Sequence, residues 1–139
     1  MKKTTRLAIL LMTAMLTLTA CEPEDRFSNG STPTPTPSTA ELLVGRWQQT
    51  TMDGQTLPSY LVAIDEYRTD GMFVSSVQNT STGVYFADSS RYTVQGDSIL
   101  YDNSGWGVDE IVLLDSLYLE KKVFISGYNA TSIYRYVRL

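Results

Sequence analysis

The sequence contains no histidine and only one cysteine among its 139 residues. Without histidine, the chain has no Ser-His-Asp or Cys-His catalytic group and no histidine-ligated zinc site. One cysteine cannot form an internal disulfide, so the chain is not a small disulfide-stabilised scaffold. Lys and Arg number 11 against 15 Asp and Glu, and the sequence pI is near 4.7. This acidic balance argues against nucleic acid as a partner, because phosphate binding needs clustered basic residues.

Long hydrophobic runs are also absent, apart from one stretch near the start of the chain. Residues 1–20 have a basic head (Lys2, Lys3 and Arg6) followed by a mostly apolar run of about fourteen residues. That run is typical of a secretory signal peptide and is too short to span a bilayer as a helix. It ends in Leu18-Thr19-Ala20-Cys21, which resembles the lipobox of bacterial lipoproteins. The resemblance implies that Cys21 is lipidated and anchors the mature chain in a membrane.

Residues 21–40 are expected to form a spacer between that anchor and a folded body. Alternating Thr-Pro favours an extended polyproline conformation and enters neither a helix nor a sheet. The acidic residues Glu22, Glu24 and Asp25 resemble the surface-export signal of Bacteroidetes lipoproteins, although simple linker solubility explains them equally well. The expected location is therefore the outer membrane, with the body facing either the periplasm or the cell surface.

Residues 41–139 are predicted to be one all-β domain. Short β-branched and aromatic runs alternate with turn residues, and no helical apolar period persists for three turns. The expected strands are residues 44–51, 60–68, 72–78, 83–87, 91–95, 98–102, 108–114, 117–123 and 132–138. An antiparallel meander of about eight or nine such strands either closes into a barrel or forms a two-sheet sandwich.

Several motifs of this body resemble the small lipocalin-like domains of Bacteroidetes-type lipoproteins. The first is Leu43-Val44-Gly45-Arg46-Trp47, which resembles the opening Gly-x-Trp of lipocalins, and the last is the closing segment 134–138. The resemblance implies a small barrel in which Trp47 lies under an arginine of the last strand, either Arg135 or Arg138. Such a cation–π contact contributes about 0.5–2 kcal/mol. A body this short implies a shallow cavity, or an interior filled by side chains.

The candidate contact residues come from strand and loop positions. Trp106 lies between two glycines in an expected loop, where an aromatic side chain often contacts a ligand or partner. Val62, Ile64 and Phe73 are candidate liners of a concave site at the barrel mouth. Ser98 and Ser116 follow aspartates and resemble acceptors of Bacteroidetes O-glycosylation, although Asp-Ser is also ordinary turn chemistry.

No catalytic residue, cofactor or metal site is expected. Asp65-Glu66 and Asp109-Glu110 are adjacent carboxylates that point to opposite strand faces, so neither pair alone can act on one glycosidic bond. We interpret them as solvated strand charges. The leading hypothesis is a non-enzymatic, lipid-anchored envelope module that holds a small apolar or amphipathic ligand. The alternative is a filled-core interaction protein that contacts a protein or glycan through surface aromatics; either would be a monomer or a weak dimer.

Overall fold

The computed structural model describes residues 35–103, 105–125 and 129–139. The chain divides into two units, Met1–Thr34 and Pro35–Leu139, and the fold described here is that of the second. The expected signal peptide, Cys21 and the spacer up to residue 34 lie outside the described residues. None of the helices in the described part is long and apolar enough to cross a membrane.

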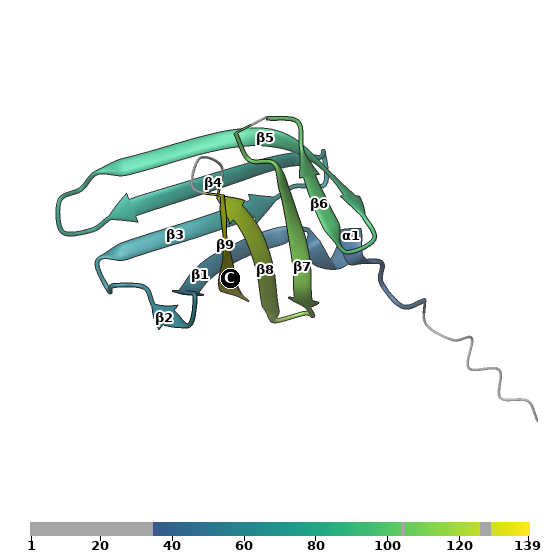
Figure 1. The fold of residues 1–139 in the computed structure, drawn as a ribbon, viewed down its shortest axis with the longest axis horizontal. Helices are drawn as coiled ribbons and strands as arrows, with labels where there is room; N and C mark the ends of the chain where they lie inside the picture. Colours follow the sequence, from purple (N-terminus) through teal and green to yellow (C-terminus); the bar gives the residue numbers. More distant parts are fainter. Residues whose placement is uncertain (1–34, 104, 126–128) are drawn as a thin grey trace, which may run out of the picture. The chain divides into compact units, whose positions relative to one another are not determined.

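The described body consists of one short helix followed by antiparallel strands (Figure 1). In chain order these elements are α1 (Thr39–Leu43), β1 (Gly45–Met52), β2 (Gln55–Thr56), β3 (Leu61–Tyr67), β4 (Met72–Asn79), β5 (Tyr85–Gln95), β6 (Ser98–Tyr101), β7 (Val108–Leu114), β8 (Tyr118–Ile125) and β9 (Ala130–Arg138).

The sheet closes on itself because the first long strand pairs with the last. From β3 to β9 every strand pairs with the next, and β1 pairs with both β3 and β9. The closing register runs from Trp47 opposite Arg138 to Met52 opposite Tyr134. The result is a closed barrel of eight antiparallel strands with β2 as a short extra strand. The predicted all-β barrel is therefore confirmed, and the two-sheet sandwich is wrong.

The residues that form the core are those whose side chains point inward as successive strand residues alternate between the two faces of the sheet. In β3, Ala63, Asp65 and Tyr67 are buried, while the residues between them are less so. Successive strand side chains point to opposite faces, so one row of each strand fills the barrel. The buried apolar cluster lies toward the α1 end of the barrel and comprises Leu43, Trp47, Tyr67, Phe73, Tyr92, Ile99, Tyr101, Ile111, Leu119 and Tyr136.

The barrel wall is uneven in length. β4 pairs with β5 from Gln78–Tyr85 to Met72–Arg91, but β6 pairs with β5 only from Tyr92 to Gln95. Figure 1 shows β3, β4 and β5 extending well beyond β6 on the side away from α1. Among the described residues, the segment Tyr85–Ser90 therefore has a strand partner on one edge only.

Three local features differ from the sequence-based expectation. The strands expected at 83–87 and 91–95 form the single strand β5, which runs through Asp88-Ser89-Ser90. These residues favour turns, but Ser90 Oγ accepts a hydrogen bond from Asn103 N at 3.0 Å, which ties this part of β5 to the following loop. The strand β2 and the helix α1 were not expected. The helix begins with a Ser38–Glu41 capping box, a signal that is visible in the sequence.

Candidate functional site

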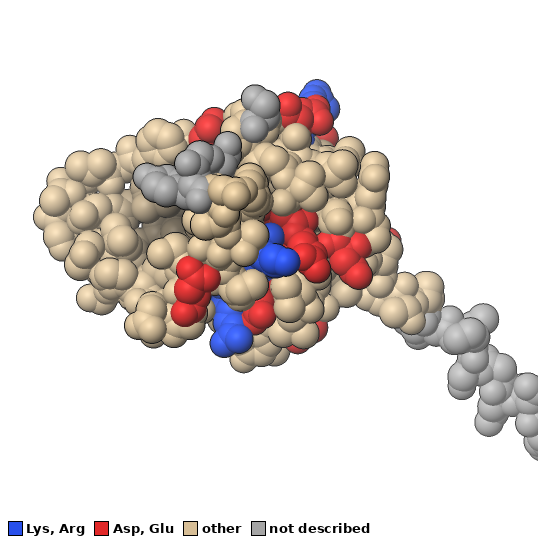
Figure 2. Space-filling model, in the orientation of Figure 1, with Lys and Arg blue, Asp and Glu red and all other residues tan. Residues whose placement is uncertain are grey.

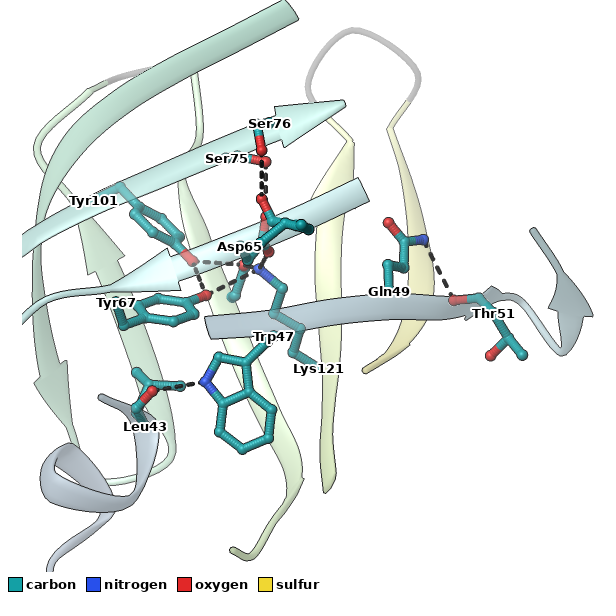
Figure 3. Close-up of polar contacts among 12 residues, drawn as sticks. Leu43, Trp47, Gln49, Thr51, Asp65, Tyr67, Ser75, Ser76, Tyr101 and Lys121 are labelled. Carbon is teal, nitrogen blue, oxygen red and sulfur yellow. Dashed lines mark hydrogen bonds and ion pairs between the residues drawn. The ribbon is translucent and has the colours of Figure 1, made fainter. Parts of the chain in front are cut away.

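A buried ion cluster occupies the middle of the barrel (Figure 3). Lys121 of β8 extends its ammonium group between two carboxylates, Asp65 of β3 and Asp109 of β7. Lys121 Nζ lies 2.9 Å from Asp65 Oδ2 and 2.9 Å from Asp109 Oδ2. Ser75 of β4 donates a 2.7 Å hydrogen bond to the other oxygen of Asp65. One cation therefore compensates carboxylates from two strands that are distant in the sequence.

Two tyrosines complete the hydrogen bonding of this cluster. Lys121 Nζ donates to Tyr67 OH at 3.1 Å, so the Tyr67 hydroxyl oxygen is an acceptor. Tyr101 OH donates to Asp109 at 2.9 Å, which leaves Tyr67 to donate to Tyr101 across 2.9 Å. The buried ammonium group therefore donates hydrogen bonds to Asp65 and Tyr67 and forms an ion pair with Asp109, which compensates its burial.

The two inner carboxylates are not solvated strand charges, and that interpretation is wrong for them. Asp65 is 5% exposed, and Asp109 and Lys121 are each 2% exposed. Their sequence neighbours behave as interpreted: Glu66 pairs with Arg68, and Glu110 pairs with Lys122 at 3.3 Å, both at the surface. Ionised together, the three buried groups carry a net charge of −1. The cluster links β3, β7 and β8 by ion pairs inside the barrel, and none of its members lines the apolar pocket described below.

Burial controls the pKa values of the groups in this cluster. It raises the pKa of the Tyr67, Tyr101 and Tyr136 hydroxyls above the ordinary 10.0, although the nearby Lys121 charge opposes the rise. For Lys121 itself, burial alone would lower the pKa, but the Asp65 carboxylate and the surrounding tyrosines raise it well above 10.5. Lys121 is therefore a protonated cation and not an amine nucleophile.

These directions predict alkaline unfolding. A group whose folded pKa exceeds its unfolded value binds more protons when folded, so its stabilising contribution is complete below the unfolded pKa and is lost above it. The free energy of unfolding should change little because of these groups below about pH 10. Above that pH it should fall by about 1.4 kcal/mol per pH unit for each group that titrates only on unfolding.

Urea unfolding between neutral pH and the alkaline limit, followed with tyrosinate absorbance, measures this effect. Buried tyrosines should ionise together with unfolding. Ionisation of Tyr67 and Tyr101 in a chain that remains folded would contradict the prediction.

The barrel end next to α1 is closed by Trp47 and Arg138. The Arg138 guanidinium carbon lies 4.3 Å from the centroid of the Trp47 ring. Trp47 Nε1 donates to Leu43 O at 2.8 Å, and Arg138 donates to Val44 O at 2.9 Å and also to Leu42 O. Both side chains thus attach the helix to the barrel.

The glycine of the Gly-x-Trp motif has a physical role at this end. Gly45 has φ +147°, and a Cβ atom there would lie 2.6 Å from Arg138 Nη1. The other candidate arginine, Arg135, pairs instead with Glu120 and is exposed. The arginine that stacks on Trp47 is therefore Arg138.

An apolar pocket of about 340 Å³ lies at the other end of the barrel. Its walls come from β1, β3, β4 and β9, and the short strand β2 with the segment that leads from it to β3 supplies the rest. It is lined by Gln49, Met52, Gln55, Thr56, Leu57, Pro58, Leu61, Ala63, Val77 and Tyr134. Burial raises the pKa of Tyr134 above 10.0, so its hydroxyl is a neutral hydrogen-bonding group at physiological pH.

This pocket has the composition of a small-molecule site. Ligand sites are mostly apolar, carry a few polar groups that orient the ligand, and occupy about 300–1,000 Å³. A larger hollow of about 500 Å³ borders α1 but includes the charged side chains Glu41 and Arg68. For an apolar ligand the uncharged pocket is the better site.

The sequence-based contact residues lie elsewhere. Phe73 is fully buried in the core. Val62 and Ile64 alternate with the buried Ala63 and Asp65, so they have the parity of the outer barrel surface. Trp106 is half-buried and packs edge-on against Phe73, with ring centroids 5.0 Å apart. None of these four residues lines the apolar pocket.

The two candidate glycosylation serines differ in accessibility. Ser116 is exposed in the turn between β7 and β8, where Asp115 Oδ1 accepts hydrogen bonds from Leu117 N and Tyr118 N. Ser98 is half-buried as the first residue of β6. Within the described part of the chain, no group of three or more Cys, Asp or Glu side chains is arranged to hold a metal ion.

Sequence reasoning missed the central cluster and most of the pocket. Lys121 alternates with Leu119 and Val123, a pattern that places all three on one strand face. Ala63, Val77 and Tyr134 likewise share the parity of neighbouring core residues. The alternation of side chains along each strand could therefore have predicted that these residues face inward. Alternation could not have predicted that β3, β7 and β8 converge on one point, because that depends on barrel closure.

The closed up-and-down barrel of eight antiparallel strands is an architecture that lipocalins share with streptavidin. No family model matches the chain, and no curated protein does.

Several solved structures are similar to it. An uncharacterized protein from Bacteroides eggerthii is 18% identical, with a TM-score of 0.49, and the match covers 70% of this chain and 99% of that one. Bovine odorant-binding protein is 16% identical, with a TM-score of 0.43, over 76% of this chain and 77% of that one. Its complex with undecanal is 16% identical, with a TM-score of 0.42, over 76% of each chain.

Proposed function

We propose that this protein is a non-enzymatic binding module of the bacterial cell envelope that holds one small apolar or amphipathic molecule. The observation that carries the proposal is the apolar pocket of about 340 Å³ at the end of the barrel opposite α1. Leu57, Leu61, Ala63 and Val77 offer apolar contacts there, and burial of apolar area contributes about 25 cal/mol per Å². A preformed barrel wall also lowers the conformational cost of binding.

The rest of the interior limits the size of the ligand. The level below Ala63 and Val77 is occupied by Asp65 and Ser75, which are paired across β3 and β4 and belong to the central ion cluster. A ligand that displaced this cluster would leave buried charges without partners, at a high free-energy cost. The site therefore favours a compact molecule, or one end of a longer amphipathic molecule, over a chain buried along the whole barrel axis.

The envelope location is supported by the sequence. The basic head, the short apolar run and the Leu-Thr-Ala-Cys ending favour export followed by lipidation at Cys21. A single acyl chain gives marginal membrane attachment, and two or more give stable anchoring. The anchored body would present its pocket in the periplasm or at the cell surface.

Ala63→Phe should block the pocket, because the added ring would project from β3 into the space that the ligand occupies. We expect the affinity for the apolar dye N-phenylnaphthylamine to fall by about tenfold or more, which corresponds to about 1.4 kcal/mol or more. Fluorescence titration of the dye against the purified protein measures the dissociation constant.

Val62→Phe is the matched control, since it adds the same ring one residue away on the outer face of β3. This variant should bind the dye as the wild type does. Equal dye affinity in Ala63→Phe and wild type, with both folded by circular dichroism, would refute binding in this pocket.

A further inference from the structure

At the barrel end that carries the pocket, the segment from β2 to β3 and the β4–β5 hairpin have no acidic or basic side chain; Asp53 lies just before them, in the turn between β1 and β2. Residues 54–64 and 71–87 contain no Asp, Glu, Lys or Arg, although the chain as a whole is 19% charged. We call residues 54–63 and 76–87 the uncharged lobe; they include β2, the outer halves of β3 and β4, and the beginning of β5. Figure 2 shows a surface without acidic or basic atoms where Figure 1 places the β4–β5 hairpin.

The uncharged lobe also exposes large apolar side chains. Val84, Tyr85 and Phe86 are 64%, 62% and 66% exposed, and Tyr60 and Val77 are exposed as well. Phe86 lies opposite Val77, which lies opposite Ala63, so the three share the inner face of the sheet. The exposed apolar surface is therefore continuous with the pocket lining. Exposed apolar surface of this kind marks a contact with a membrane, a ligand or a protein.

We propose that the uncharged lobe docks into the interfacial region of a lipid bilayer, so that the pocket opens toward the membrane. The distribution of charge favours this occupant. The body from residue 41 to 139 has 7 basic and 12 acidic residues, a net charge of 7 − 12 = −5. A charged side chain is costly to move into lipid, and an acidic surface is repelled by anionic headgroups. The uncharged lobe is the part of the body that enters the interface without either cost.

The depth of docking is limited by the strand itself. Tyr85–Ser90 of β5 has unpaired backbone groups on one edge among the described residues, and such groups require hydrogen-bonding partners that hydrocarbon lacks. Asp88 is exposed in the same segment, three residues or about 10 Å along the strand from Tyr85. The lobe therefore lies at the headgroup level, where tyrosine side chains are enriched at membrane surfaces.

Docking at this end goes beyond the proposed function, since it would stand even if the pocket held no ligand. If the pocket holds a ligand, membrane docking identifies the membrane as the source of that ligand. An apolar molecule dissolved in the bilayer would enter the pocket without crossing water.

Tryptophan quenching by brominated lipids tests the docking. Tyr85→Trp places the reporter in the uncharged lobe, and Tyr118→Trp places it at the barrel end that contains Trp47, where the native tyrosine is 51% exposed. Each protein is mixed with phosphatidylcholine vesicles that are brominated near the headgroup or near the chain ends. The emission added over the parent protein should be quenched in Tyr85→Trp, more strongly by shallow than by deep bromine, and not in Tyr118→Trp.

A charge in the lobe should reverse the docking. Val84→Glu added to Tyr85→Trp should reduce the quenched fraction by about tenfold, because it places a charge where the proposal has an apolar side chain entering the lipid interface. Leu117→Glu, at a site that is 60% exposed, is the matched control and should have no effect. Absence of quenching in Tyr85→Trp would overturn the proposal, and it would leave the open edge of β5 as a site for a protein strand. The dye titration of Ala63→Phe decides the pocket function separately.

Discussion

Replacement of Lys121 by methionine should lower the free energy of unfolding by about 3–5 kcal/mol. Methionine retains an unbranched side chain of similar length, so the packing volume changes little. The loss is electrostatic: Asp65 and Asp109 would remain buried without the cation that lies 2.9 Å from each of them. Tyr67 would also lose its hydrogen-bond donor. Urea unfolding at neutral pH, followed by circular dichroism, measures the difference.

Lys122→Met is the matched control on the next residue of β8. Its ammonium group faces outward and pairs with Glu110 at 3.3 Å, where both side chains are exposed. Exposed ion pairs contribute at most about 1 kcal/mol, so this variant should be nearly as stable as the wild type. Equal losses in the two variants would contradict the role assigned to the buried cluster.

A compensated variant separates charge from packing. The combination of Lys121→Met with Asp65→Asn and Asp109→Asn removes the uncompensated charge and should recover part of the loss. A deficit that these replacements leave unchanged would indicate a packing defect.

The buried cluster also shows how far a strand pattern can be interpreted from sequence. The alternation of Leu119, Lys121 and Val123 places the lysine on an inward row. A lysine in such a row is ordinarily interpreted as solvated because lysine is rarely buried unless it is paired. Its partners lie 56 residues away at Asp65 and 12 residues away at Asp109. That pairing depends on barrel closure between β1 and β9, which no local pattern encodes.

The positions of the strands could be predicted from the sequence more fully than the residues of the site. The period-two alternation and turn residues such as Gly71 and Gly96, both with positive φ, indicate most strands and two of their connections. The sequence does not predict that β5 continues through Asp88-Ser89-Ser90, because these residues favour turns. The hydrogen bond from Asn103 to Ser90 that ties this part of the strand to the following loop is a tertiary contact, which the local sequence does not reveal. The pocket was misplaced for a related reason. Val62 and Ile64 are more apolar than Ala63, but it is parity that decides which residue faces inward.

The strand that closes the barrel supplies the second large effect, which concerns two arginines that the sequence could not separate. Arg138→Leu should lower the free energy of unfolding by about 2–4 kcal/mol, whereas Arg135→Leu should change it by less than about 1 kcal/mol. Arg138 donates to the carbonyls of Val44 and Leu42 and lies over the Trp47 ring at 4.3 Å. Its loss removes the cation–π contact and leaves two carbonyls without their donor.

Arg135 pairs with Glu120 at the exposed surface, where an ion pair contributes little. Urea unfolding of both variants gives the comparison, and Arg138→Lys refines it. A lysine retains the charge but not the planar fork that reaches two carbonyls while it stacks on Trp47, so its stability should fall between those of Arg138→Leu and the wild type. If Arg135→Leu and Arg138→Leu lower the free energy of unfolding equally, the two arginines would stabilise the protein through net charge and not through closure of the barrel at Trp47.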